Sequence, residues 1–247
     1  MFKIWYRDFI VWTHYKGASL VANLGEPLLY LFALGYGLGR YVTSFGGESY
    51  AEFISPALVV VSVMNTASFE NTFSSYTRLS VQKTYDAIAV TPLSLKQIIL
   101  GEILWATTKS CFSAFMMMIV FWIAGLIHHP LAISILLLCF IVGVLFSSMG
   151  MLVTALAKSY EFFSYYFTLF ISPMFLFSGT FFPLHELPSW AKWIAWFLPL
   201  THAVTAAREL FAGRISLTLG LALLWLIVAS LIFTWIAVRR MEKRLVV

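Results

Sequence analysis

Four ionisable side chains lie inside apolar stretches of this chain, and they are the residues best placed for chemistry. Three are carboxylates, Glu26, Glu70 and Glu102, and one is an amine, Lys109. A charge within a bilayer costs about 2.5–3.5 kcal/mol on insertion scales, so each needs a partner or a function. The three glutamates are expected at a similar depth, roughly 9 Å from the cytoplasmic end of their helices. Lys109 lies two turns beyond Glu102 on the same helical face, and its long stem can reach back toward this acidic layer.

Three interpretations of this polar cluster remain open. It can form the cytoplasmic mouth of a transport path, where the headgroup of a substrate enters. It can be a buried ion-pair network that fixes helix packing and transports nothing. It can also be a proton relay in an ion-coupled transporter. The residue types alone favour the packing network over the other two.

Motifs for catalysis and nucleotide binding are absent from the sequence. No glycine is followed by lysine, so the phosphate-binding loop G-x-x-x-x-G-K-[ST] does not occur. Neither H-E-x-x-H nor C-x-x-C occurs, and the adjacent His128 and His129 supply too few ligands for a metal ion. We therefore expect no catalytic residue, metal or cofactor in this chain, and we expect its energy to come from a partner. A membrane enzyme acting on lipid or polyprenyl substrates remains an alternative.

A run of aromatic residues between positions 160 and 182 offers broad, weakly directional stacking surfaces, which suit sugar rings. Helix packing and lipid contact explain most of the same composition. Three residues of this run are candidates to line a substrate path: Tyr165, Tyr166 and Phe170.

Residues 78–92 form a short polar stretch that has both a charged and an apolar side over two to three helical turns. A helix of this kind can insert into a groove on a cytoplasmic partner, with apolar anchors and a charged rim. An ordinary solvated loop helix fits the residues equally well. The candidate docking residues are Arg78, Lys83, Tyr85, Asp86 and Ile88.

The composition indicates that a membrane positions all of these residues. The chain has 247 residues, of which 61% are hydrophobic and 11% are charged. Its mean hydropathy is +0.88. Soluble domains average about 25% charged residues, so a stand-alone soluble enzyme, a disordered protein and a secreted disulfide scaffold are excluded. The few, scattered basic residues fit anionic lipid better than nucleic acid.

The sequence predicts an all-α membrane protein that is a single domain over residues 1–247. Residues 1–18 are expected to form an amphipathic helix lying in the membrane interface. Three prolines interrupt residues 182–214, which we expect to form a re-entrant hairpin in the outer leaflet, with a plain surface loop as the alternative. Six apolar segments are expected to be transmembrane helices: 19–38, 51–73, 97–127, 133–157, 162–181 and 215–238.

The distribution of Lys and Arg predicts the orientation of these helices. With both termini in the cytoplasm, eleven basic residues lie on the inner side and four on the outer side. Because Lys and Arg concentrate in cytoplasmic loops, both termini are expected on the cytoplasmic side of the membrane.

Several blocks of the sequence form a recognisable pattern along the chain. The C-terminal pattern includes Ser178-Gly179-Thr180-Phe181-Phe182-Pro183, Leu187-Pro188 and Leu198-Pro199-Leu200-Thr201-His202, followed by Arg208 and Gly213. Earlier blocks are Asn23-Leu24-Gly25-Glu26-Pro27, Ser68-Phe69-Glu70, Leu100-Gly101-Glu102 with Trp105-Ala106-Thr107-Thr108-Lys109, and Val153-Thr154-Ala155-Leu156-Ala157. Together these blocks, which cover nearly the whole chain, resemble the type-2 ABC exporter permeases, in particular a branch that exports lipo-oligosaccharides.

This resemblance implies a six-span permease of the bacterial inner membrane that forms a homodimer and binds two copies of a separate ATPase subunit. ATP and Mg²⁺ are then expected in the partner and not in this chain. The resemblance also implies that residues 78–92 are the coupling helix, that residues 1–18 are an elbow contacting the ATPase, and that residues 182–214 are re-entrant. Its substrate is expected to be an amphipathic glycolipid, lipid-linked or oligosaccharide-type molecule.

Overall fold

The computed structural model describes residues 1–37, 39, 41 and 49–245, without the side chains of residues 20, 22–24, 26 and 27. Within that part of the chain the regular structure is helical, and no strand occurs. The side chain of Glu26 therefore lies outside the described residues, although its backbone belongs to a helix.

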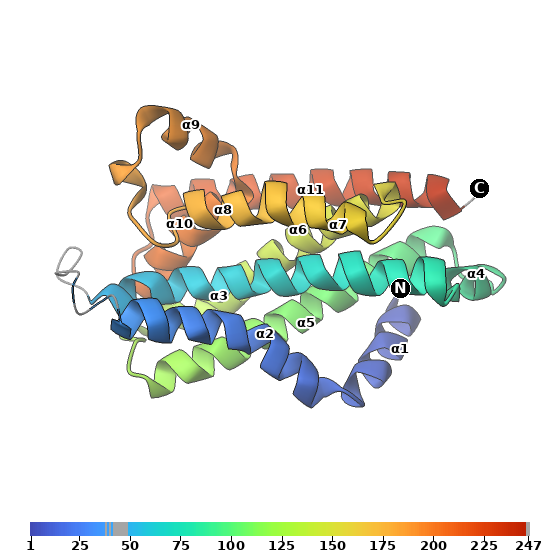
Figure 1. The fold of residues 1–247 in the computed structure, drawn as a ribbon, viewed down its shortest axis with the longest axis horizontal. Helices are drawn as coiled ribbons and strands as arrows, with labels where there is room; N and C mark the ends of the chain where they lie inside the picture. Colours follow the sequence, from blue (N-terminus) through green and yellow to red (C-terminus); the bar gives the residue numbers. More distant parts are fainter. Residues whose placement is uncertain (38, 40, 42–48, 246–247) are drawn as a thin grey trace.

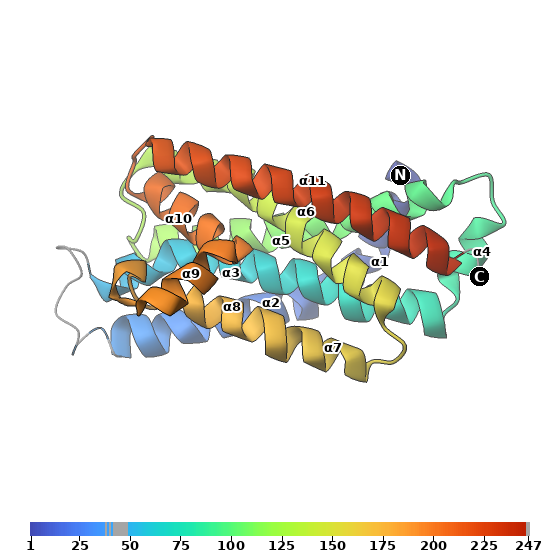
Figure 2. The ribbon, with the colours of Figure 1, turned by 90° about the horizontal axis from the view of Figure 1, so that it is seen from above.

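Four long helices form the body of the protein. They are α3 with its continuation to Val81 (Tyr50–Val81), α5 (Leu95–Ile123), α6 with its preceding turn (Pro130–Leu156) and α11 (Leu217–Leu245). Each is long and apolar enough to cross a membrane. The most extensive contacts join α6 to α11, α5 and α3, and α3 to α5, and the four helices run side by side (Figures 1 and 2). The chain is therefore an all-helical, multi-pass membrane protein.

Two further helical stretches are shorter. The first consists of α2 (Lys16–Tyr30) and a π-helical segment, Leu31–Gly37. The second consists of α7 (Glu161–Tyr166), a π-helical segment, Phe167–Ile171, and α8 (Ser172–Phe177). They coincide with the first and fifth of the six expected spans, but their apolar parts are shorter than those of the four long helices. The count of six spans therefore stays a prediction.

The helix that contains α3 continues beyond the predicted end of the second span. It begins at a capping box in which the side chains of Ser49 and Glu52 bond each other's backbone amides. It continues through two wide π-helical turns, Glu70–Ser74 and Thr77–Val81. The helix therefore ends at Val81, eight residues after the predicted end at Phe73. The extension matters for the site, because it places Arg78 two turns from Glu70 on one continuous helix.

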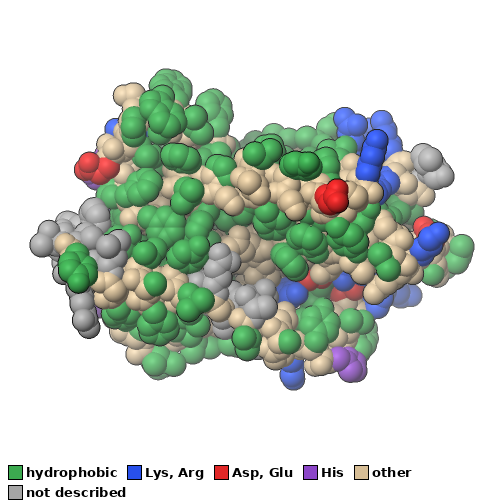
Figure 3. Space-filling model, viewed as in Figure 1, with side chains coloured by type: hydrophobic (Ala, Val, Ile, Leu, Met, Phe, Trp, Pro, Cys, Tyr) green, Lys and Arg blue, Asp and Glu red, His purple; other side chains and the backbone are tan. Residues whose placement is uncertain are grey.

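The two ends of the bundle carry different elements. The amphipathic helix α1 (Phe2–Thr13), the short helix α4 (Thr84–Ala89) and the last described residues of α11 lie toward one end, whereas α9 (Ser189–Phe197) and α10 (Pro199–Phe211) lie toward the other (Figure 1). Apolar side chains cover much of the middle of the visible face, and Lys and Arg gather at the end that carries α4 (Figure 3).

The turn that leads into α9 is fixed to the body by two long-range hydrogen bonds. Arg208 on α10 donates to the carbonyl of Gly179 at 2.6 Å, and its guanidinium lies 3.9 Å from the centre of the Phe53 ring. The hydroxyl of Tyr50 donates to the carbonyl of Phe181 at 3.0 Å. Gly179 has φ +78°, a left-handed conformation that glycine adopts without steric cost.

Candidate functional site

Helix α1 lies against α5 and brings its polar face to the four-helix body. The indole of Trp5 donates to Thr108 Oγ1 at 3.0 Å, and Trp12 packs edge-on against Trp105 and Phe112 at ring distances of 6.1 and 5.2 Å. The hydrogen bond of one indole and the ring packing of the other together hold α1 against α5 in position and in rotation. The polar side of α1 therefore faces the body and not the membrane interface alone.

Gly101 permits the close approach of these two helices, which leads to a first prediction. A Cβ atom at Gly101 would lie 2.7 Å from Ile4 Cβ and 2.9 Å from the carbonyl oxygen of Met1. Gly101→Ala is therefore expected to push α1 away and to destabilise the protein by about 1–3 kcal/mol. Gly220→Ala is the matched control, since nothing lies within 4 Å of a Cβ there. Thermal unfolding of both variants in detergent is the measurement, and equal midpoints would contradict the packing argument.

Six charged side chains from α1, from the extended α3 and from α5 meet in one network. Arg7 Nη2 lies 2.8 Å from Glu102 Oε1, and Arg78 Nη2 lies 2.7 Å from Glu102 Oε2. Arg78 also reaches Glu70 Oε1 at 3.1 Å, and Lys109 Nζ lies 2.7 Å from Glu70 Oε2. We call this set the ion network, and its members are Arg7, Asp8, Glu70, Arg78, Glu102 and Lys109.

Asp8 connects the two arginines of the ion network. Its Oδ1 lies 2.7 Å from Arg7 Nη2 and 3.7 Å from Arg78 Nη1. The indole of Trp105 adds a hydrogen bond to Glu70 Oε1 at 3.2 Å. Three cations thus balance three carboxylates, and the network has no net formal charge.

Burial makes this balance necessary. The side chains of Glu102 and Glu70 are 0% and 1% exposed, and that of Arg78 is 13% exposed. Removing one partner of a buried ion pair costs about 3–5 kcal/mol, because the other charge is left without compensation. Removing two opposite charges together is far less costly. The ion network therefore joins three chain segments into one unit whose arrangement depends on its charge balance.

Three of the four residues that the sequence singled out as an intramembrane cluster meet here. Glu70, Glu102 and Lys109 are all in the ion network, and Lys109 does reach an acidic partner at the level of Glu70. Glu26 lies outside the described side chains. Their ion pairs join α1, α3 and α5, as the interpretation as a packing network predicts.

Sequence reasoning missed Arg7, Asp8 and Arg78 as members of the network. Arg78 was expected at the rim of the docking helix, because the second span was taken to end at Phe73. The eight-residue spacing from Glu70 to Arg78 is the signal that could have found it, since residues two turns apart share a helical face. The contact of α1 with α5 leaves no such local pattern, so Arg7 and Asp8 could not be placed from spacing.

Asp8 lies outside the membrane-spanning segments and makes the network sensitive to pH. Burial raises the pKa of Asp8 from its ordinary value of 3.8 to about 6, and the nearby charge of Glu102 adds to the rise, while Arg78 and Arg7 oppose it. Because the pKa is higher in the folded protein, protonation of Asp8 favours the folded state. This contribution is complete below about pH 4 and is lost as the pH rises through about 6.

A second prediction follows from the raised pKa of Asp8. Between about pH 4 and pH 7, the wild-type protein is expected to lose up to about 3 kcal/mol of stability relative to Asp8→Asn, whose side chain does not ionise. The measurement is the thermal unfolding midpoint of both proteins over that range. Profiles that run parallel would show that Asp8 does not titrate in the network.

The segment expected to dock a partner is divided by the structure into two parts. Arg78 belongs to the extension of α3, whereas Tyr85 and Ile88 lie on α4. Tyr85, expected as an anchor for a partner, is 1% exposed and packs with Ile4 and Ile98 in a core cluster of this chain. In this conformation Tyr85 therefore anchors α4 to the body, and Ile88 packs partly against the same cluster.

The outward surface of this loop consists of other residues. Lys83 and Asp86 are exposed, as expected, and they are joined by Val81 and Val90, which are 66% and 88% exposed. Lys83, at the N-terminus of α4, has φ +50°, a left-handed conformation that is uncommon for non-glycine residues. Exposed apolar side chains flanked by charges are typical of a surface that binds another protein.

The three aromatic residues proposed to line a path face different ways. Tyr166 is 5% exposed, and its hydroxyl lies 3.3 Å from Ser68 Oγ inside the bundle. Tyr165 and Phe170 are 64% and 58% exposed on the outer surface of the single subunit. Only these two can contact a substrate or another subunit without rearrangement. Among the described residues no group of three or more His, Cys, Asp or Glu side chains could hold a metal ion.

The fold and the site together define a class of protein. A bundle of four helices long and apolar enough to span a membrane, joined near one end to helix α1 by an ion network, defines a helical multi-pass membrane protein. The ion network connects the body to a loop that presents an exposed, partly apolar surface.

Comparison with known proteins agrees with this class. The profile of the ABC-2 type transporter family matches residues 1–212, and the chain belongs to that family. It is similar to nodulation protein J of Rhizobium leguminosarum bv. viciae, with 36% identity over 97% of this chain and 94% of the relative. Nodulation protein J of R. leguminosarum bv. trifolii is 38% identical over 85% of this chain and 80% of that protein. The inner membrane transport permease YadH of Escherichia coli K12 is 24% identical over 96% of this chain and 94% of that protein.

Proposed function

We propose that this chain is the permease subunit of an ATP-driven exporter that moves an amphipathic lipid-linked, glycolipid or oligosaccharide-type substrate across the bacterial inner membrane. The observation that carries the proposal is the ion network between the exposed loop and the body. In this proposal the chain supplies the passage and has no catalytic residue. Its similarity to nodulation protein J and to an inner membrane transport permease supports transport as the activity.

The geometry suggests how force on the loop reaches the spanning helices. Arg78 lies in the last turn of the extended α3 and is bound to Glu102 on α5, and Tyr85 on α4 is buried beside Ile4 on α1. A push on α4 is therefore transmitted to three helices at once. Because a charge-balanced network tolerates few intermediate arrangements, it favours a switch between discrete packings over gradual bending.

The motive force is proposed to come from a separate ATPase subunit, present in two copies. The sequence has no phosphate-binding loop, so ATP and Mg²⁺ are expected in that partner. The proposed docking surface consists of exposed residues at the tip of the loop. They are Val81, Lys83, Asp86 and Val90.

We further propose six spans, with α2 and the α7–α8 stretch as the first and fifth, and both termini in the cytoplasm. The gathering of Lys and Arg at the end that carries α4 supports this orientation (Figure 3). In this arrangement α9 and α10 lie on the outer side, as a re-entrant hairpin. A stretch of 17 residues, Glu161–Phe177, is at the lower limit of length for a spanning helix.

The passage is proposed to lie between two copies of this chain. Tyr165 and Phe170 are exposed on a helix that a single subunit leaves uncovered, and such aromatic faces suit sugar rings and acyl chains alike. A homodimer would place two of these surfaces opposite each other.

Reconstitution into vesicles tests this function. The permease with its ATPase is expected to move a fluorescent glycolipid across the bilayer only when ATP and Mg²⁺ are present. The permease alone, with or without a proton gradient, is expected to move none. Transport by the isolated permease on a gradient would show an ion-coupled carrier, and chemical conversion of the lipid by the isolated permease would show an enzyme. Either result would overturn the proposal.

A further inference from the structure

The extended α3 contains a π-helical turn, Glu70–Ser74, that lies between two members of the ion network, Glu70 and Arg78. In this turn the amide of Ser75 donates to the carbonyl of Glu70, five residues back, whereas an α-helix bonds four residues back. In a regular α-helix, with about 100° per residue, Arg78 would lie about 80° around the axis from Glu70, at the edge of the face that they share. The extra residue of one π turn reduces this offset to about 20°, so the turn aligns Arg78 with Glu70.

Helix α6 holds this turn in place through buried hydrogen bonds. Thr154 Oγ1 donates to the carbonyl of Asn71 at 2.6 Å, and the side-chain amide of Asn71 donates to the carbonyl of Ser147 at 3.0 Å. Asn71 and Thr154 are both fully buried, so no solvent competes for these bonds. Gly150 permits the close approach, because a Cβ atom there would lie 3.1 Å from the carbonyl oxygen of Ser68. A π turn is rare within an α-helix, and here α6 supplies the contacts that stabilise it.

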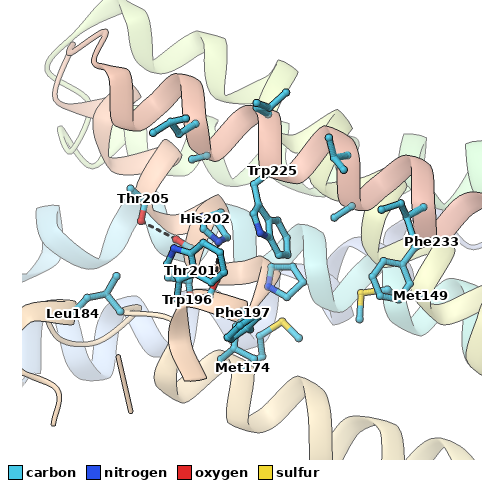
Figure 4. Close-up of a pocket in the computed structure, with 18 of the residues that line it drawn as sticks. Met149, Met174, Leu184, Trp196, Phe197, Thr201, His202, Thr205, Trp225 and Phe233 are labelled. Carbon is cyan, nitrogen blue, oxygen red and sulfur yellow. Dashed lines mark hydrogen bonds between the residues drawn. The ribbon is translucent and has the colours of Figure 1, made fainter. Parts of the chain in front are cut away.

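The same part of α6 is bonded to α11 and borders a cavity. Ser148 Oγ lies 2.7 Å from Thr234 Oγ1, and the guanidinium of Arg244 donates to the carbonyl of Thr154. Met149, the neighbour of Ser148, lies at one end of a cavity of about 1020 Å³ that extends along α11 (Figure 4). A shift of α6 on this side meets the cavity and not packed side chains of this chain. Helix α6 can therefore change its distance from the π turn, and α11 is bonded to the segment that moves.

We propose that the turn Glu70–Ser74 is a two-state switch controlled by Thr154. In the π form the hydrogen bond of Thr154 keeps Arg78 in the ion network. When α6 withdraws this bond, the turn becomes α-helical and the residues beyond it rotate by about 100° relative to Glu70, which takes Arg78 away from Glu70 and Glu102. Thr154 is thus a positioning residue for the network. The exchange between the two forms rests on the proposed function, because transport is the process that uses it, whereas the hold of Thr154 on Arg78 does not.

The first experiment measures the hold of Thr154 on Arg78 without transport. Arg78→Met is expected to lower the thermal unfolding midpoint in detergent less than half as much in a Thr154→Val protein as in the wild-type chain, because Arg78 has already left its partners there. Thr107→Val is the matched control. Thr107 is equally buried, but its hydroxyl donates to Ile103 of its own helix at 2.8 Å, so Arg78→Met should there cause the full loss. Equal losses in the Thr154→Val and wild-type proteins would overturn the proposal.

The second experiment removes the switch and keeps the alignment. Deletion of Ser74 takes the extra residue out of the turn, so a regular α-helix then brings Arg78 to the face of Glu70. The unfolding midpoint is expected to stay within about 3 °C of the wild type. Transport in vesicles with the ATPase and ATP should fall at least tenfold, while binding of the ATPase is unchanged. Deletion of Ala67, in the α-helical part of α3, is the control, since it rotates the whole network segment and should lower the midpoint by at least about 6 °C.

Two results of the second experiment would overturn the switch. Equal midpoints for the two deletions would show that the turn holds no extra residue. Transport at the wild-type rate after deletion of Ser74 would show that the turn keeps one form throughout. If the wild-type chain with its ATPase moves no substrate, the proposed function is wrong and the exchange falls with it, but the hold of Thr154 on Arg78 is still decided by the unfolding midpoints.

Discussion

Arg78→Met is expected to destabilise the permease by about 3–5 kcal/mol and to abolish transport, because it leaves two buried carboxylates short of a partner. Arg78 contacts three carboxylates, Glu102 at 2.7 Å, Glu70 at 3.1 Å and Asp8 at 3.7 Å, whereas Arg7 contacts two. The thermal unfolding midpoint in detergent should fall by at least about 6 °C. Lys109→Met should cost less, since Glu70 keeps its bonds to Arg78 and Trp105.

The double variant Arg78→Met/Glu102→Gln separates charge balance from side-chain packing. It removes one charge of each sign and leaves two cations facing two carboxylates, so most of the lost stability should return. Arg240→Met, at an exposed position on α11, is the control. Its free energy of unfolding should differ from that of the wild-type protein by no more than about 0.5 kcal/mol. A double variant as unstable as Arg78→Met would show that the charge balance of the network is not what matters.

Val90→Asp is expected to abolish binding of the ATPase and to reduce ATP-driven transport more than tenfold without changing the stability of the permease. Val90 is 88% exposed at the tip of the loop, so the substitution disturbs no internal contact. In an interface, however, it would bury an unpaired charge, which costs several kcal/mol, roughly 2–5 or more. The measurements are co-purification of the two subunits and transport in vesicles.

Ile215→Asp provides the matched control for the docking prediction. Ile215 is 82% exposed and lies between α10 and α11, at the other end of the bundle. Its substitution should leave both binding and transport intact. If Val90→Asp binds the ATPase as well as the wild-type chain, the docking surface lies elsewhere and the loop acts only as a support for Arg78 and Tyr85.

The helical class and the approximate positions of the long helices could be predicted from the sequence, because apolar length is a local property. The segments around α5, α6 and α11 were located to within a few residues at most ends. The C-terminal end of the second predicted span was not, since its extension from Phe73 to Val81 is polar in sequence. The charge in this polar extension is that of Arg78, and its partners Asp8 and Glu102 are on other helices. The sequence around Phe73 therefore does not show that the helix continues.

The candidate site was predicted in part. Glu70, Glu102 and Lys109 could be identified from the sequence, because a charged side chain inside an apolar stretch is costly to place in the hydrocarbon core of a membrane. Tyr85 shows the limit of the same reasoning: an aromatic residue on an amphipathic loop helix fits a partner's groove and the chain's own core equally well. Only the packing of α4 on Ile4 and Ile98 decides between them in this conformation.

The sequence by itself determined that this chain is a membrane protein, that it has no nucleotide-binding loop and that a few charged residues lie within its apolar segments. What only the tertiary structure decided is which of these charges meet. Arg7 and Glu102 are 95 positions apart, yet they lie 2.8 Å from each other, because Gly101 lets α1 rest directly on α5. Composition and spacing act along the chain, whereas the balance of buried charge is set between segments that only folding brings together.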